Sequence, residues 1–362
     1  MSGLTGPYLA LLMAIQENPL STVSALVDKV DGSKPTVIKR LKYLRDNRYF
    51  QVKGLLDYHK MGLESVDLIL ETSTLKNVER LEQVATNHPY TVYRSRCFGS
   101  HNGLFLQFRT PIGTRPLIEE LIKILGERDL AKNGQIFSMG EVPVISSSMK
   151  LEVWDPQTMT WRFNLDKWFS SDADLVKIEK PSGKPESTLQ WLTKNDMHIL
   201  QQLTLDAKRS HAAMIRAIKK NGVSITPQTF GRRLRMIDEG CIDRYRVSFD
   251  PAAFDIITNI LIRGNATRKF LSKLYARMSS NPIPFESTFK VSDRELFWFV
   301  RMPPSHLSAL LSNLHANLDN MTVTLIDYSK SFLYSIWPET LDETGHAWRK
   351  DHEFMIDFAL KR

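Results

Sequence analysis

Hydrophobic and polar residues recur with a helical period in the stretch KPTVIKRLKYLRD, which begins at Lys34. Val37, Leu41 and Leu44 follow one another at intervals of four and three, so they share one face of an α-helix. The other face carries polar, aromatic and cationic residues: Pro35, Thr36, Lys39, Lys42 and Tyr43. We therefore predict a helix with one buried face and one exposed cationic face. The YFQV that follows it favours a strand.

The same pattern occurs a second time in the chain. Residues 39–57 align without a gap on residues 232–250, at an offset of 193. Phe230, Leu234 and Ile237 form the expected buried face of the second helix. Its exposed face carries Gln228, Thr229, Arg232 and Arg235. An internal repeat of this length predicts two modules of similar structure.

Two short helical patterns precede the cationic helix in each copy. They are PYLALLMAIQEN and STVSALVDKV in the first copy, and KNDMHILQQLTL and HAAMIRAIKKNG in the second. Ser21 and Asn195 are the expected N-caps, and Gly222 the expected C-terminal stop. Three short helices followed by a β-hairpin make a winged helix-turn-helix unit.

Strand and helix patterns alternate after each unit. In the first copy VDLILET, TVYRSRCFG, GLFLQFRT and GQIFSMGEV favour strands, with helices expected at 77–86 and 115–127. In the second copy ITNILIRG, FESTFKV, ELFWFVRM and MTVTLIDYS favour strands, with helices expected at 268–280 and 305–317. Each copy gives the order β-α-β-β-α-β, which is the ferredoxin-like arrangement. The predicted fold class is therefore α+β.

Tryptophan-containing tails close both copies. WDPQTMTWRF begins at Trp154 and WPETLDETGHAWR begins at Trp337. We expect their aromatic residues to anchor a helix on a sheet or on the other copy, with a ligand pocket as the alternative. Residues 179–188, EKPSGKPEST, have the composition of a linker.

The net charge of +8 is concentrated in two segments. Residues 32–60 and 205–246 each carry a net charge of +6, so the rest of the chain carries −4. Cations localised in this way are typical of a surface that binds a polyanion. Small polar residues at the start of the third helix can reach base edges in a major groove, and cations beside them can pair with phosphates. The predicted DNA-binding residues are Ser33, Lys34, Pro35, Thr36, Lys39, Arg40, Lys42, Tyr43, Arg48, Lys53, Thr226, Gln228, Thr229, Arg232, Arg233, Arg235, Arg244 and Arg246.

The remaining composition restricts the class of protein. The longest apolar run, LALLMAI, is too short to span a bilayer, and the first residues have no basic segment of a secretory signal. Cys97 and Cys241 stand alone, so we expect neither a disulfide framework nor a thiolate zinc site. A cytoplasmic protein with no membrane partner is the expectation.

A winged helix-turn-helix followed by Leu56-Asp57, Met61-Gly62-Leu63 and a βαββαβ unit resembles the Lrp/AsnC (feast/famine) family of prokaryotic transcription regulators. The resemblance implies a RAM domain, which pairs subunits and senses small molecules, so a homodimer or higher oligomer and a small-molecule effector are expected. The effector loops would be Gly99, Ser100, His101, Asn102 and Asp293, although neither loop keeps the family's G-x-x-D pattern. For His101 alone, an exposed loop position is the stronger expectation.

On this resemblance the chain divides into six parts: a winged helix-turn-helix at 1–58, a RAM-like domain at 62–147, a tail and linker at 148–190, a second winged helix-turn-helix at 191–250, a second RAM-like domain at 254–334 and a tail helix at 335–362. That family usually has one module per chain. Two modules in one chain predict an intramolecular pseudo-dimer, in which unlike recognition helices bind an operator with unlike halves.

Known catalytic motifs are absent from the sequence: we find no P-loop, no G-x-G-x-x-G after a strand, no H-E-x-x-H and no G-x-S-x-G. We therefore expect no catalytic residues, no metal, no cofactor and no enzymatic activity. One enzyme alternative stays open, because siroheme decarboxylases resemble the same fold and bind a tetrapyrrole through His and Arg. His101, Arg94, Arg96 and the tryptophan tails would serve it. A winged-helix scaffold for protein partners is the third alternative.

Overall fold

A computed structural model describes residues 4–137, 144–171 and 188–361. The linker predicted at 179–188 lies outside these residues except for Thr188. The end of the predicted strand GQIFSMGEV also lies outside them, beyond Phe137. Within the described residues, no helix combines the length and the apolar character needed to cross a bilayer.

The first helical unit contains α1 (Gly6–Glu17), α2 (Val23–Val27) and α3 (Lys34–Asp46). Thr22, rather than Ser21, caps α2 by accepting a hydrogen bond from the amide of Ala25. The buried face of α3 consists of Val37, Leu41 and Leu44, as predicted, and it packs against buried leucines of α1 and α2.

The second helical unit repeats this arrangement with α7 (Lys194–Asp206), α8 (His211–Lys220) and α9 (Pro227–Cys241). Thr193, not Asn195, caps α7 in a capping box with Asp196. Asn221 and Gly222 end α8, and Gly222 has the positive φ that favours glycine. Lys208 ties this unit to the first one, because its ammonium donates hydrogen bonds to the carbonyls of Pro19 and Ser21.

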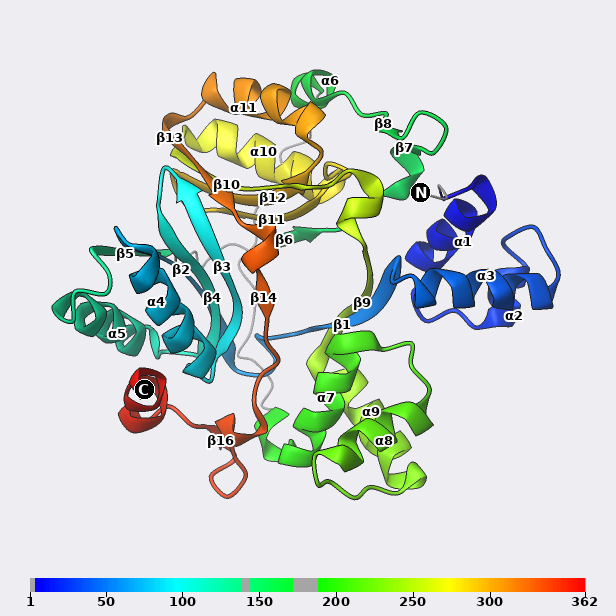
Figure 1. Cartoon of the computed structure of the whole chain (residues 1–362), viewed down its shortest axis with the longest axis horizontal. Helices are drawn as coiled ribbons and strands as arrows, with labels where there is room; N and C mark the ends of the chain where they lie inside the picture. Colours follow the sequence, from blue (N-terminus) through cyan, green and yellow to red (C-terminus); the bar gives the residue numbers. More distant parts are fainter. Residues whose placement is uncertain (1–3, 138–143, 172–187, 362) are drawn as a thin grey trace.

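The strand after each third helix differs from the prediction in its pairing. β1 (Phe50–Leu56) and β9 (Ile242–Phe249) pair with each other in an antiparallel ribbon, whereas the sequence pattern predicts a hairpin within each module. The ribbon runs between the two helical units (Figure 1). Exposed main-chain groups of one module thus find their partners in the other.

Two ferredoxin-like units follow the helical units. The first contains β2 (Leu63–Glu71), α4 (Leu75–Asn87), β3 (Thr91–Gly99), β4 (Gly103–Pro111), α5 (Arg115–Glu127) and β5 (Asn133–Phe137). The second contains β10 (Thr258–Asn265), α10 (Arg268–Ser280), β11 (Glu286–Val291), β12 (Glu295–Met302), α11 (Leu307–His315) and β13 (Asp319–Ile326). Each has the predicted βαββαβ order, so the predicted α+β fold is confirmed.

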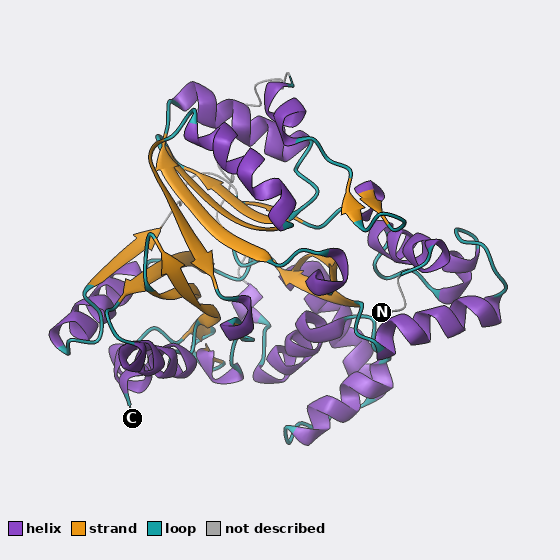
Figure 2. Ribbon diagram, turned by 45° about the horizontal axis from the view of Figure 1, so that its top comes forward, coloured by secondary structure: helices purple, strands orange, loops and turns teal. Residues whose placement is uncertain are grey.

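The two units share one curled sheet, with its helices on the outer side (Figure 2). The strand order is β5-β2-β4-β3-β13-β10-β12-β11-β6, in which β3 pairs with β13 across the modules and β6 (Ile145–Ser147) adds to the far edge. Phe105, Phe297 and Ile69 belong to a buried cluster that joins the two inner faces. The strands of the two units are therefore joined in one sheet within the chain.

Each tryptophan tail packs on the opposite module. The first tail contains the hairpin of β7 (Trp154–Asp155) and β8 (Thr160–Trp161) and then α6 (Leu165–Ser170). The indoles of Trp161 and Trp168 donate to the carbonyls of Phe254 and Asn281 in the second module. β14 (Phe332–Leu333) follows the second unit and pairs with β3. The second tail contains β15 (Leu341–Asp342), β16 (Ala347–Trp348) and α12 (Phe358–Leu360), and its Trp348 donates to the carbonyl of Met61 in the first module.

Candidate functional site

The outward face of α3 carries cations without an acidic partner. Lys34, Lys39 and Lys42 are exposed, and none of them makes an ion pair with a described residue. Ser33 and Thr36, at the start of the helix, are joined through their hydroxyls at 3.0 Å, and Pro35 beside them is exposed. The face therefore presents small polar groups at its N-terminal end and ammonium groups along its length.

Two other predicted residues of α3 have structural contacts. Arg40 is half-buried and donates a hydrogen bond to the carbonyl of Asp31 at 2.6 Å. Tyr43 is half-buried between Tyr8 and Tyr49, with ring centroids 5.1 and 6.1 Å away. Packing thus accounts for Tyr43 without a nucleic-acid contact.

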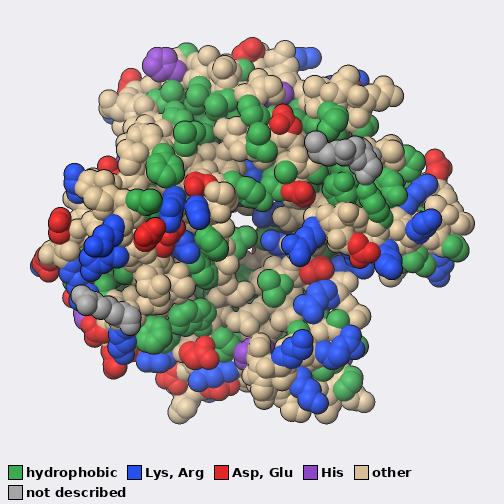
Figure 3. All heavy atoms as spheres, in the orientation of Figure 1, with side chains coloured by type: hydrophobic (Ala, Val, Ile, Leu, Met, Phe, Trp, Pro, Cys, Tyr) green, Lys and Arg blue, Asp and Glu red, His purple; other side chains and the backbone are tan. Residues whose placement is uncertain are grey.

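The outward face of α9 has the same character. Arg232 and Arg235 are exposed and make no ion pair within the part of the chain that the structure describes. Thr226 caps the helix and bonds to Thr229, and Gln228 lies exposed between them. On the face in Figure 3, Lys and Arg side chains lie over α7, α8 and α9 with few acidic side chains among them.

Arg233 is the exception on α9, because it points into the protein. Its guanidinium binds the buried carboxylate of Asp196 and the carbonyl of Trp191, and it lies over the Trp191 ring. Asp196 keeps the pKa of Arg233 above its ordinary value. Arg233, which the sequence predicts as a DNA contact, instead ties α9 to Asp196 of α7 in the structure.

Four of the predicted DNA-binding cations, Arg48, Lys53, Arg244 and Arg246, lie on the β1–β9 ribbon or at the turn before it. Arg48 is exposed at the turn before β1, with a φ of 57°. Arg244 pairs with Asp243 and donates to the carbonyl of Ser146. Lys53 and Arg246 are half-buried and face Glu286, so they do not lie on an exposed surface beside the recognition helices, as the predicted contacts with DNA phosphates assume.

A group of four charged residues, which we call the hinge cluster, lies where the ribbon meets the sheet: Lys53 of β1, Arg246 of β9, Glu286 of β11 and Arg301 of β12. Arg246 and Arg301 each place a guanidinium nitrogen 3.2 Å from an oxygen of Glu286. Arg301 also donates to the amide oxygen of Asn259 at 3.0 Å. The side chain of Lys53 makes no hydrogen bond or ion pair with a described residue, so three cations share one carboxylate.

The pKa values in the hinge cluster follow from this imbalance. Burial lowers the pKa of Lys53, Glu286 opposes this effect, and the nearby Arg246 and Arg301 lower the pKa further. Burial by itself would raise the pKa of Glu286, but Arg246, Arg301 and Lys53 together hold it below its ordinary value. Glu286 is therefore ionised and the cluster carries excess positive charge.

The residues predicted to bind an effector are not brought together. His101 is 6% exposed, against our expectation of an exposed loop position, and its Nδ1 lies 2.8 Å from the hydroxyl of Thr324 on β13. Ser100 accepts a hydrogen bond from the amide of Val323 on the same strand. Gly99 and Asn102 bond to each other within the loop. Asp293 pairs with Arg268.

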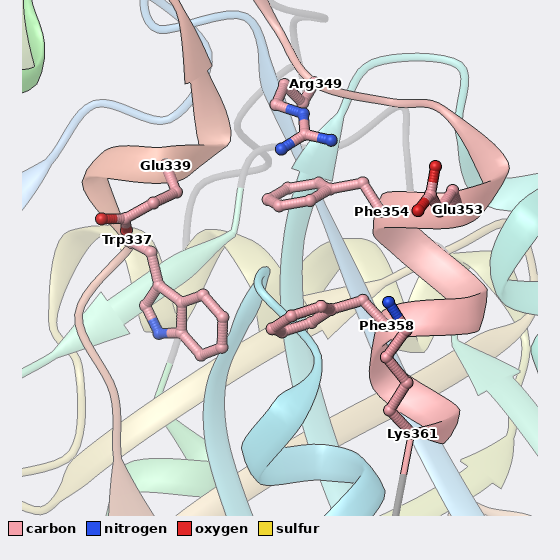
Figure 4. A pocket seen from close by; sticks show the side chains of 7 residues that line it. All are labelled: Trp337, Glu339, Arg349, Glu353, Phe354, Phe358 and Lys361. Carbon is pink, nitrogen blue, oxygen red and sulfur yellow. The ribbon is translucent and has the colours of Figure 1, made fainter.

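A pocket of about 520 Å³ lies in the second tail, where the sequence favours an anchor. Its lining combines three aromatic rings with charged groups (Figure 4): Trp337, Glu339, Arg349, Glu353, Phe354, Phe358 and Lys361. The guanidinium of Arg349 lies 3.9 Å from the centre of the Phe354 ring, and Phe354 stacks on Phe358. Aromatic and cationic side chains together suit a flat, anionic ligand.

The described residues contain no comparable site for a metal ion. Within residues 4–137, 144–171 and 188–361, no group of three or more His, Cys, Asp or Glu side chains is placed to hold a metal ion. Arg94 and Arg96 of β3, considered for the tetrapyrrole alternative, pair with Glu82 of α4.

Comparison with known proteins identifies the fold. No protein-family model matches the chain, and no curated protein matches it. Two crystal structures of the siroheme decarboxylase NirDL, one of them in complex with an iron-uroporphyrin III analogue, match 94% of this chain and 97% of theirs, with 12% identity and TM-scores of 0.52 and 0.53. A transcriptional regulator from Neisseria meningitidis in complex with L-Met matches 37% of this chain and 88% of its own, with 20% identity and a TM-score of 0.31.

The two NirDL structures share the fold of this chain over nearly its whole length, and at 12% identity the likeness concerns the fold alone. They also contradict our expectation that the chain has no enzymatic activity. The structures that match it over nearly its whole length are those of an enzyme. A search for short catalytic motifs could not have found the likeness to an enzyme, because that likeness lies in the arrangement of helices and strands.

Glu286 and Arg301 of the hinge cluster were not among the residues predicted for a site. Both lie in segments that we assigned to strands, FESTFKV and ELFWFVRM, and they are direct partners in the ladder of β11 and β12. The signal was a pair of charged residues at alternate positions of one strand, Glu286 and Lys290, because side chains at alternate positions lie on the same face of a sheet.

Proposed function

We propose that this chain binds double-stranded DNA through the outward faces of α3 and α9 and regulates transcription. The observation that carries this proposal is the selective pairing of cations on these helices. Arg233, which points inward, has a buried carboxylate partner, whereas Lys39, Lys42, Arg232 and Arg235 have none among the described residues. Unpaired exposed cations at equivalent positions of two helices are suited to the phosphates of a polyanion.

The local structure of the helices supports major-groove binding. Each begins with small polar side chains that can approach base edges, at Ser33 and Thr36 in α3 and at Gln228 and Thr229 in α9. Since the two sets differ, the preferred site would have two unlike halves.

The test measures binding of the full chain to duplex DNA by fluorescence anisotropy over a range of salt concentrations. Lys39→Ala with Lys42→Ala should weaken binding and reduce the slope of log affinity against log salt by about 2, because each phosphate that a lysine no longer neutralises removes about 0.9 from the slope. The matched control is Lys269→Ala with Lys273→Ala, two exposed lysines of α10. The proposal would be contradicted if the chain bound no duplex at low salt. It would also be contradicted if the two double variants lost the same affinity for DNA.

A second candidate function is catalysis on a tetrapyrrole carboxylate, and the pocket of the second tail favours it. Its aromatic rings can cover a flat macrocycle, while Arg349 and Lys361 can bind carboxylates at its edge. Loss of CO₂ leaves an electron pair on carbon that takes up a proton, and Glu353 is one group in this pocket that can carry one. The seven lining residues include no His or Cys, so the fit is to the ring and its carboxylates and not to a central iron.

The test is an absorbance titration of the full chain with iron-uroporphyrin III, followed by measurement of CO₂ release. Arg349→Met with Lys361→Met should weaken binding at least tenfold and leave DNA binding unchanged. Lys269→Met with Lys273→Met is again the control. Absence of a spectral change at equimolar ligand would contradict this second function without affecting the first.

A further inference from the structure

The hinge cluster carries more positive charge than nearby carboxylates neutralise. Lys53, Arg246 and Arg301 face the single carboxylate of Glu286, which leaves two positive charges in excess. Neither arginine pairs with any other described carboxylate, and Asp206 influences Lys53 only from a distance. Among the described residues the cluster is thus short of two negative charges.

Partial burial makes this imbalance costly. The side chains of Arg246 and Arg301 are 19% and 20% exposed, so water screens them less than it screens surface cations. Burying a charge without a partner is unfavourable, and a bound anion would relieve that cost. Guanidinium groups bind the oxygens of carboxylates and phosphates in a fixed planar geometry, which suits them to this task.

The cluster is also open to small molecules. The side chain of Glu286 is 30% exposed. The space-filling view in Figure 3 is hollowed at its centre, and Lys and Arg side chains border the opening. Because the side chains of Glu286, Arg246 and Arg301 are partly exposed, solvent reaches the cluster.

The position of the cluster connects it to both DNA-binding helices. Lys53 and Arg246 are direct partners in the β1–β9 ladder, one from each module. β1 begins four residues after the end of α3, and β9 begins directly after α9. A ligand held by Lys53, Arg246 and Arg301 would join the ribbon to β12 and so influence how both helices are held relative to the sheet.

We propose that Lys53, Arg246 and Arg301 form a binding site for a small dianion with carboxylate or phosphate oxygens, and that its occupancy changes the affinity of α3 and α9 for DNA. The second half of this statement rests on the proposed DNA binding, whereas the first half does not. The site is distinct from the loops that the sequence suggests for an effector, since it contains none of their residues.

The first experiment tests the site without DNA. The full chain is titrated by calorimetry with malonate, succinate and inorganic phosphate, each at constant ionic strength with chloride as the background. We expect saturable binding of at least one probe, and comparison of the three distinguishes a dicarboxylate from a phosphate ligand. Absence of saturable binding for all three would overturn the site.

Variants of opposite expected effect make this experiment sharper. Lys53→Met should weaken binding at least fivefold, because it removes a cation that has no partner among the described residues. Glu286→Gln should strengthen binding at least threefold, because it removes the carboxylate that competes with the ligand. Lys269→Met on α10 is the matched control and should leave binding unchanged. Equal affinities in all four proteins would place the anion elsewhere and contradict the site.

The second experiment tests the linkage. The affinity for duplex DNA is measured with and without the probe that binds most tightly, in wild type and Lys53→Met. A change of at least threefold in wild type that disappears in the variant supports the linkage, and no change in wild type contradicts it. If the chain binds no DNA at all, the proposed function fails, and hydrogen exchange of the β1 and β9 amides with and without the probe then decides the linkage: unchanged protection contradicts it.

Discussion

Lys53 and Arg246 lie directly opposite each other in the ribbon that joins the two modules, and both face Glu286. Like charges opposite each other destabilise an antiparallel pair. Glu286 offsets this repulsion, because its carboxylate attracts Arg246, Arg301 and Lys53 together. The stability of the ribbon therefore depends on a residue that belongs to neither of its strands.

Glu286→Gln should consequently destabilise the protein in a low-salt buffer free of dianions. We expect a loss of about 1 to 3 kcal/mol in the free energy of unfolding, since two guanidinium groups lose their charged partner. Unfolding in urea measures this loss of free energy. Glu295→Gln is the control, because Glu295 of β12 is the ion-pair partner of Arg263. It should lower the free energy of unfolding by less, because a single cation is involved. Equal losses of unfolding free energy in the two variants would show that Glu286 does not stabilise the ribbon in the way we infer.

Arg232 and Arg233 are neighbours on α9 whose substitution should have different effects. Arg232→Ala with Arg235→Ala should weaken DNA binding and leave the melting temperature unchanged, because both side chains are exposed and unpaired in the described part of the chain. Arg233→Met should instead cost about 3 to 5 kcal/mol, because it leaves the buried carboxylate of Asp196 without its cation. Anisotropy and thermal unfolding together separate the two roles. A stable Arg233→Met protein with reduced DNA affinity would reverse our assignment.

His88 should make the protein sensitive to acid. Burial lowers the pKa of His88 to about 3, from 6.5 for an unperturbed histidine. Neutral His88 therefore contributes stability that is fully present above pH 6.5 and is lost as the pH falls from 6.5 toward 3, by about 1.4 kcal/mol per pH unit. His88→Asn keeps an acceptor for the amide of Tyr90 but cannot titrate in this range.

Unfolding in urea at pH 7.5, 5.5 and 4.5 checks this prediction. The difference in unfolding free energy between wild type and His88→Asn should be largest at pH 7.5 and should shrink at the two lower values. A difference that is independent of pH would show that His88 is not buried in its neutral form.

The first tail should be fixed by a specific hydrogen bond as well as by apolar packing. The indole of Trp161 donates to the carbonyl of Phe254 at 2.7 Å, whereas the indole of Trp154, its partner across the hairpin, makes no hydrogen bond among the described residues. Trp161→Phe should therefore cost about 1 to 3 kcal/mol more than Trp154→Phe. Thermal unfolding of the two variants measures the difference, and an equal shift would mean that packing alone holds the tail.

Local patterns predicted most elements of the fold closely. The expected helices at 115–127 and 268–280 correspond to α5 and α10, and the strands TVYRSRCFG and ELFWFVRM correspond to β3 and β12. These segments have a clear period of hydrophobic residues, which depends only on their own sequence.

Contacts between distant segments were not predictable in the same way. A strand that follows a third helix has the same sequence pattern whether it forms a hairpin or pairs with the other module, as β1 and β9 do. His101 is polar and lies in a loop, yet it is buried because β13, more than 200 residues later, covers that loop. The hinge cluster depends on the same long-range arrangement, since its members come from four strands.

The crossing of the two tails means that covalent continuity is not what holds the halves of the molecule together. Trp161 and Trp168 bind the second half, Trp348 binds the first, and β1 and β9 complete one another. Two polypeptides made by cutting the chain between its halves would each expose a ribbon strand and a tryptophan tail that only the other could cover. Such fragments should be poorly folded alone and should reassemble as an obligate heterodimer when expressed together.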